Sequence, residues 1–164
     1  MKKIKSNYII IALFIIVVIG LIIVLNRKEN NTPNKDKYTI VSNVSTFFTV
    51  EGCVNRYLNS LSKGNIEDIM ILVDKNYIEN NGLNNENILE HLGKKDGDYS
   101  FSAKKMYSKQ NNSEVKYYIY GLLKEETLDS RDYGVDFYII VNIQNNETYS
   151  IEPLNEELFE EVSR

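Results

Sequence analysis

The side chains best suited to nucleophilic chemistry in this sequence are a single cysteine and a single histidine. Cys53 would need an electropositive, accessible setting, because the thiolate is the reactive species. His91 is its only candidate imidazole partner, and nothing in the sequence brings the two together. Cys53 also lies within an apolar helical stripe, where a free cysteine packs as a small hydrophobe. We therefore interpret Cys53 as a core residue, with a nucleophile or an intermolecular disulfide as the alternatives.

Metal-ligand spacing is missing from the sequence. His91 has no partner at a zinc-type spacing. It lies in the last turn of a short predicted helix, where the helix dipole favours a cationic side chain, so a structural role explains it. Asp96 and Asp98 stand close together in "KKDGDYS", but no run of oxygen ligands typical of a calcium loop follows them. We expect a turn at this place, and the sequence predicts no metal ligand and no cofactor-binding residue.

The elements that must position these residues begin with helices. An apolar stripe at helical spacing predicts a first helix around Cys53, ended by Gly64. Asn65 can cap a second helix, with Asp68 at its N3 position. A third short helix is predicted over residues 85–92, followed by Gly93. The stripe of the first helix consists of Val50, Cys53, Val54, Tyr57, Leu58 and Leu61.

From Tyr99 the apolar period changes to two, which predicts antiparallel strands. Four strands are expected: residues 99–107, 114–123, 133–143 and 149–151. Helices followed by a strand meander predict an α+β roll, with about three helices packed on one face of a curved four-stranded antiparallel sheet. The tail, residues 154–164, could form a short helix with Leu154, Leu158 and Val162 aligned. The first strand is predicted to place Tyr99, Phe101, Ala103, Lys105 and Tyr107 on one face.

The central strands are apolar on their second face as well. We name Tyr118, Tyr120, Tyr138 and Ile140 the tyrosine face, and these four residues are the candidate partner-binding residues. A partner protein, a second copy or the terminal segment could cover such a face. The alternative is that tyrosine serves only as a good strand former with a wettable tip.

The charge is distributed unevenly along the chain. Residues 1–37 carry seven basic and two acidic side chains, whereas residues 38–164 carry twelve basic and twenty-one acidic ones. An acidic domain is a poor match for nucleic acid, whose affinity depends largely on phosphate neutralisation. We therefore expect no nucleic-acid partner.

A run of eighteen uncharged residues, 8–25, predicts a transmembrane helix. A cleavable signal peptide is the alternative, but it expects a shorter apolar run and a small-residue cleavage site. The expected organisation is a short cytoplasmic tail at 1–7, the span at 8–25, a polar linker at 26–37 and an extracytoplasmic domain at 38–164. Basic side chains flank the run on both sides, and the short tail favours an inside N-terminus.

The segment "YLNSLSKGNIEDIMILVD" crosses from the first predicted helix to the second. With the helices and meander around it, over residues 47–152, it resembles the nuclear transport factor 2-like fold, a cystatin-like α+β roll. The chain is also similar to uncharacterised membrane-anchored proteins of AT-rich Gram-positive bacteria. In architecture alone it resembles a core subunit of conjugative and type IV secretion machines. This fold hosts enzymes, binding modules and assembly subunits alike, so the resemblance implies no single function.

The resemblance also implies a form of catalysis, since some enzymes of this fold pair a tyrosine donor with an aspartate base in a conical pocket. Tyr117, Tyr138 and Asp136 supply these residue types. The carboxylate would need a cleft and a shifted pKa, and phosphate-loop, nucleophile-elbow and zinc motifs are missing. We predict no catalytic residue and expect that the protein is not an enzyme.

The sequence thus favours a single-pass, membrane-anchored extracytoplasmic module that binds another envelope protein or itself. A small-molecule-binding roll, with or without catalysis, is the alternative. A cell-envelope spacer without any ligand is a third hypothesis.

Overall fold

The computed structural model describes residues 38–94, 96–126, 134–145 and 148–164. The chain divides into two units, Met1–Asn34 and Lys35–Arg164, and every described residue belongs to the second. The division falls within the predicted linker at 26–37. All the helices and strands of the described residues therefore lie in the second unit.

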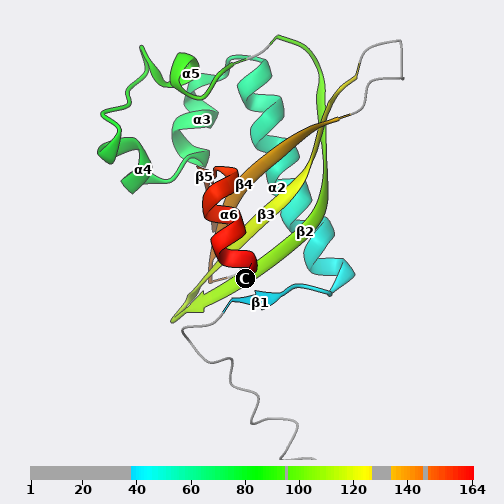
Figure 1. Ribbon diagram of the computed structural model, residues 1–164. Helices are drawn as coiled ribbons and strands as arrows, with labels where there is room; N and C mark the ends of the chain where they lie inside the picture. The colour runs from blue at the N-terminus through cyan, green and yellow to red at the C-terminus, as the bar shows by residue number, and fades with distance from the viewer. Residues whose placement is uncertain (1–37, 95, 127–133, 146–147) are drawn as a thin grey trace, which may run out of the picture. The chain divides into compact units, whose positions relative to one another are not determined.

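The second unit is an α+β domain with a single antiparallel sheet (Figure 1). The strands follow one another in the sheet in chain order, so the sheet is a simple meander. The helices are α2 (Val44–Ser62), α3 (Ile66–Leu72), α4 (Lys75–Asn80), α5 (Ile88–His91) and α6 (Glu156–Ser163); the strands are β1 (Thr39–Ile40), β2 (Tyr99–Asn111), β3 (Glu114–Glu125), β4 (Val135–Gln144) and β5 (Thr148–Pro153).

The helix boundaries follow local signals that the sequence predicts. The Asn43 side chain caps α2 by accepting from the Thr46 N–H at 3.2 Å. Gly64 ends that helix with a φ of +65°, a conformation that favours glycine. Asn65 then caps α3 by accepting from the Asp68 N–H at 3.3 Å, as expected. These caps set the sharp turn between α2 and α3.

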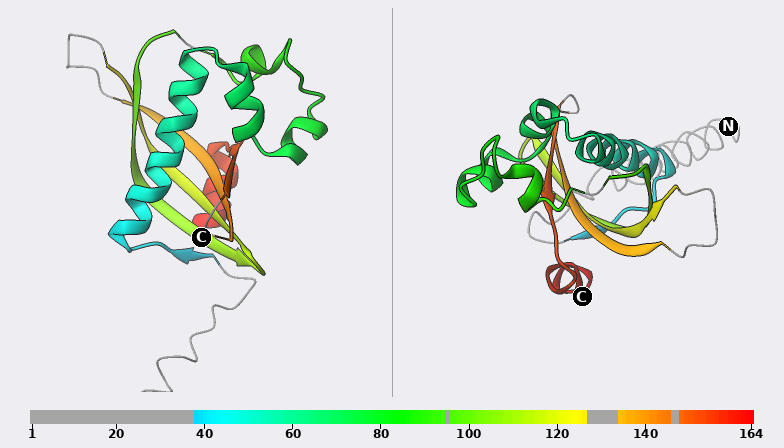
Figure 2. Two further views of the ribbon diagram at one scale, coloured as in Figure 1. Left: turned by 180° about the vertical axis from the view of Figure 1, so that it is seen from behind. Right: turned by 90° about the horizontal axis from the view of Figure 1, so that it is seen from above.

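The main core lies between the sheet and the apolar stripe of α2. The predicted stripe is confirmed: its members Val50, Val54, Tyr57, Leu58 and Leu61 are all buried. Each fully buried aliphatic side chain contributes roughly 1.5–3 kcal/mol of transfer free energy. The strands curve around α2, whereas α6 lies on the opposite face of the sheet (Figure 2). The domain therefore has three layers, with helices on both faces of the sheet.

The predicted fold needs several corrections. The sheet has five strands rather than four, because the short β1 pairs with β2 through Thr39 opposite Ser108. The described residues form five helices rather than about three, since α4 is added and the tail forms α6, the short helix considered for residues 154–164. The helices do not share one face, because α6 packs on the other.

The predicted transmembrane helix is also corrected. None of the helices within the described ranges is long and apolar enough to cross a membrane. The predicted span, residues 8–25, lies outside the described residues. The described residues form an α+β domain, and none of its helices supports the membrane, signal-anchor and single-pass assignments.

A β-bulge corrects the predicted pattern of β2. The pairing of β2 with β3 shifts between Ala103 and Lys105, so Lys104 is an extra residue. Beyond the bulge the side chains exchange faces, because strand side chains alternate strictly. Phe101 and Met106 therefore belong to the main core, whereas Tyr107 packs on the opposite face with α6.

Candidate functional site

The C-terminal helix covers much of the tyrosine face. Phe159 of α6 is 6% exposed, and its ring lies 5.8 Å from that of Tyr107, 6.0 Å from Tyr120 and 5.5 Å from Tyr138. Among the coverings that the sequence left open, the terminal segment is the one observed. The sequence had aligned Leu158 with the inner side of this helix, but Leu158 is 49% exposed and Phe159 takes its place.

The four candidate partner-binding residues do lie on one face, but they have different neighbours. Tyr120 and Tyr138 pack against each other, with ring centroids 5.2 Å apart. Tyr118 meets the ring of Tyr38 edge-on at 5.1 Å. Ile140 is buried at 8% exposure and, with Tyr118, lines a cavity of about 410 Å³ beside α6. Binding of a partner at this face stays a prediction, and any partner would have to share the face with α6.

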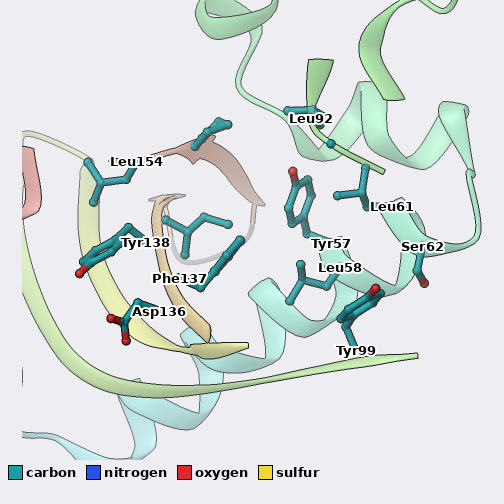
Figure 3. A pocket seen from close by; sticks show the side chains of 13 residues that line it. Tyr57, Leu58, Leu61, Ser62, Leu92, Tyr99, Asp136, Phe137, Tyr138 and Leu154 are labelled. Carbon is teal, nitrogen blue, oxygen red and sulfur yellow. The ribbon is translucent and has the colours of Figure 1, made fainter. Parts of the chain in front are cut away.

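A second cavity, of about 280 Å³, lies on the other side of β4 at the end of β5. Its walls are mostly apolar and come from α2, the segment after α5, β4 and the end of β5 (Figure 3). We call this cavity the β4 pocket. Its apolar lining includes Leu58, Leu61, Leu92, Phe137, Ile139 and Leu154, and its polar lining includes Tyr57, Ser62, Tyr99, Asp136 and Tyr138.

Tyr57 brings a hydroxyl to the β4 pocket. Its side chain is only 3% exposed, and within the described part of the chain its hydroxyl forms no hydrogen bond. Burial raises the pKa of the phenol well above its ordinary value, so the hydroxyl stays protonated at neutral pH. Tyr57 and Phe137 both project into the pocket region from opposite walls (Figure 3). Tyr57 can therefore donate a hydrogen bond to an acceptor that enters the pocket.

The position of Phe137 depends on a close approach between strands. Phe101 packs edge-on against Phe137, with ring centroids 5.7 Å apart. The Phe101 ring lies directly over Gly121, where an added Cβ would come within 2.5 Å of the ring and of the Ser102 carbonyl. Glycine is needed there because no side chain fits. This packing fixes one wall of the β4 pocket.

Side chains of α2 cover the edge of β2 beyond β1. The Asn55 amide donates to the Phe101 carbonyl at 3.1 Å and accepts from the Phe101 N–H at 2.8 Å. Glu51 accepts from the Ala103 N–H at 2.8 Å. These two side chains occupy backbone hydrogen-bonding groups of β2 that an added strand would use, which blocks edge-to-edge pairing there.

A polar cluster attaches α4 to the sheet on the tyrosine-face side. Asn142 is fully buried and donates to Glu152 at 2.7 Å, and Lys116 donates to the same carboxylate oxygen at 3.1 Å. Ser150 donates to Asp74, the N-cap of α4, at 3.0 Å. The charged groups of this cluster are engaged with one another, and we assign it a structural role.

The residues that the sequence singled out for chemistry do not converge. Cys53 is half-buried in α2, and burial raises the pKa of its thiol, which opposes thiolate formation. His91 lies in the last turn of α5, where its Nε2 is 3.0 Å from the Tyr77 hydroxyl. Asp96 pairs with Lys94 at 3.1 Å. The described residues contain no group of three or more acidic, His or Cys side chains placed to hold a metal ion.

The tyrosine–aspartate arrangement implied by the family resemblance is not assembled. Tyr117 packs into the main core, whereas Tyr138 lies on the opposite face of the sheet. The Asp136 carboxylate is exposed and accepts from the Tyr120 hydroxyl at 2.8 Å. Comparison with protein-family models, with curated proteins and with solved structures finds no match. The nuclear transport factor 2-like resemblance therefore stays a prediction.

Neither the β4 pocket nor the covered edge of β2 was predicted from the sequence. The apolar stripe places Tyr57 in the core but does not indicate where its hydroxyl lies. Glu51 and Asn55 are four residues apart beside that stripe, a spacing that places two polar side chains together at the border of the buried face. That signal could have suggested a polar contact between the first helix and a strand.

Proposed function

We propose that this domain is a non-catalytic protein-binding module, and that it takes an apolar group of its partner into the β4 pocket. The observation that carries the proposal is the mostly apolar β4 pocket, into which Tyr57 presents its hydroxyl. A ligand that supplies an acceptor would add a hydrogen bond from this hydroxyl to the apolar contacts of the pocket.

The chemistry around the pocket favours binding over catalysis. Tyr57, Tyr99 and Tyr138 all have raised pKa values, chiefly because burial disfavours the phenolate. None of these phenols can serve as a base or nucleophile at neutral pH. The nearby Asp136 is exposed and bonded to Tyr120. The pocket thus offers shape, apolar surface and a hydrogen-bond donor.

The size of the pocket suits one large apolar side chain or an apolar molecule of similar size. Pockets for drug-sized ligands measure roughly 300–1,000 Å³, and the β4 pocket measures about 280 Å³. It therefore suits a group about the size of one large side chain.

A fluorescent apolar probe tests whether the pocket accepts such a group. The neutral dye N-phenyl-1-naphthylamine should bind the full-length protein saturably and gain fluorescence. Ser62→Trp places an indole in the pocket lining and should reduce the saturable signal at least severalfold. Lys63→Trp is the matched control, because Lys63 is exposed and does not line the pocket. Equal dye binding by the two variants, with both folded, would refute the pocket as the binding site.

A further inference from the structure

One stretch of strand edge differs from the other edges of the sheet. β5 ends at Pro153, which pairs with Ile139 of β4. Residues 135–138 of β4 continue beyond this point, and no described strand pairs with them on that side. The β4 pocket lies at the same place, since Asp136, Phe137 and Tyr138 are part of its lining.

The hydrogen bonds of the sheet show which backbone groups face this edge. The Ile151 carbonyl accepts from the Asp74 N–H at 2.9 Å, so Ile151 faces away from β4. The backbone N–H and C=O groups of the next residue, Glu152, therefore point toward β4, where Glu152 pairs with Ile140. Because backbone groups alternate along a strand, Tyr138 and Asp136 point their N–H and C=O groups the same way as Ile140.

The bonds on β2 give the same alternation independently. Met106 faces outward, because its carbonyl accepts from the Val41 N–H at 2.9 Å. Met106 pairs with Ile119, and Ile119 pairs with Ile139, so the backbone N–H and C=O groups of Ile139 point toward β3. The backbone groups of its neighbour Tyr138 therefore point toward the open edge. Two independent sets of bonds therefore place the backbone groups of Asp136 and Tyr138 at that edge.

Two other stretches of described edge are covered. Asn55 and Glu51 bond the outward groups of β2 beyond β1. Val73 runs alongside β5 and forms a parallel bridge with Ile151. Residues 135–138 form a described edge that stands unpaired next to the mostly apolar β4 pocket, which is the arrangement that strand-addition sites use.

The charge at this edge indicates the chemistry of the partner. Asp136 lies on the edge itself, and it is the only charged residue that lines the pocket among the described residues. Asp136 accepts a hydrogen bond from the Tyr120 hydroxyl at 2.8 Å, and Glu156 is the first residue of α6, which packs on Tyr138 through Phe159. Both carboxylates therefore belong to the Tyr138 side of the strand. A cationic side chain on that side would be attracted by both.

We infer that an extended peptide segment with a basic–apolar–basic core adds to β4 opposite residues 136–138. Paired residues of antiparallel strands share a face. The peptide residue opposite Phe137 therefore directs its apolar side chain into the β4 pocket. The residues opposite Asp136 and Tyr138 direct their cations toward the carboxylates of Asp136 and Glu156. This inference rests on the proposed function and specifies its partner.

The experiment is a selection of randomised seven-residue displayed peptides on the full-length protein. Enriched sequences should share the basic–apolar–basic core. A synthetic peptide of the enriched sequence should lose at least about tenfold in affinity when one of its edge-facing amides is N-methylated, because a backbone hydrogen bond is removed. N-methylation of the amide that faces solvent is the matched control. Absence of enrichment, or equal affinity of the two N-methylated peptides, would overturn the inference.

A pair of variants tests the protein's own backbone. Asp136→Pro and Asp136→Ser both remove the carboxylate, but only proline removes the edge-facing N–H. The proline variant should bind the peptide about tenfold more weakly than the serine variant, with folding checked by circular dichroism. Equal binding by two folded variants would contradict strand addition. If Asp136→Pro does not fold, the N-methylated peptides decide the matter.

The two tests fail separately. Dye binding without any enriched peptide would overturn strand addition and leave the β4 pocket as a site for a small apolar ligand. Peptide binding that Ser62→Trp leaves unchanged would remove the pocket from the site. Self-association of the protein that excludes the peptide, and that Asp136→Pro weakens relative to Asp136→Ser, would assign the edge to a second copy of the chain and overturn the inference.

Discussion

The side-chain amide of Asn55 pairs with the backbone of Phe101 in both directions, donating to its carbonyl at 3.1 Å and accepting from its N–H at 2.8 Å. One side chain of α2 thus replaces one residue of a neighbouring strand. The contact fixes where α2 lies along β2, and it holds Phe101, which packs against the Phe137 wall of the β4 pocket.

Replacing Asn55 by alanine should destabilise the domain. The substitution leaves the Phe101 N–H and carbonyl without partners, which costs about 1–3 kcal/mol. Urea unfolding followed by circular dichroism measures the change in the free energy of unfolding. Asn59→Ala is the control, because Asn59 is an exposed residue of the same helix. Equal stability of the two variants would show that the edge contact adds nothing.

Phe159→Ala should release α6 from the tyrosine face. The Phe159 ring packs among three tyrosine rings, and its truncation should cost about 3 kcal/mol. Hydrogen exchange of the α6 amides should become much faster. Leu158→Ala, at an exposed position of the same helix, should change neither measurement appreciably. Unaltered exchange in Phe159→Ala would mean that other contacts hold α6.

Tyr57 should make the domain sensitive to alkaline pH. Burial raises the pKa of its phenol above the ordinary value near 10. The contribution of the neutral phenol is complete below the unfolded-state pKa near 10, and it is lost as the pH rises toward the folded-state pKa. Tyr57→Phe cannot ionise, so its stability relative to the parent protein should increase as the pH rises through about 10. Parallel loss of stability in both proteins would contradict this.

Cys53 should react slowly with iodoacetamide at neutral pH. Burial raises the pKa of its thiol and limits access to it. The chain has no other cysteine, so mass spectrometry of the intact protein reports this site alone. The control is Cys53→Ala combined with Gly52→Cys, because Gly52 is exposed and has open space around an added Cβ. Equally fast alkylation of both proteins would revive a reactive role for Cys53.

The sequence by itself determined the features that depend on near neighbours. The apolar stripe of α2, the cap at Asn65, the turn at Gly64 and the alternation of β3 all arise from residues a few positions apart. Helix and strand periods are local properties of the backbone, and for that reason they can be predicted from spacing.

Only the tertiary structure decided how those elements meet. The bulge at Lys104 moves Tyr107 to the other face of the sheet, although nothing in the alternation of residues 99–107 marks a bulge. The exit of β5 at Pro153 leaves residues 135–138 of β4 unpaired among the described strands and opens the β4 pocket. Register and strand length are set by pairing energies between distant segments, and no local pattern encodes them. The candidate site is formed by contacts between distant segments, so the sequence contains its residues but does not show their arrangement.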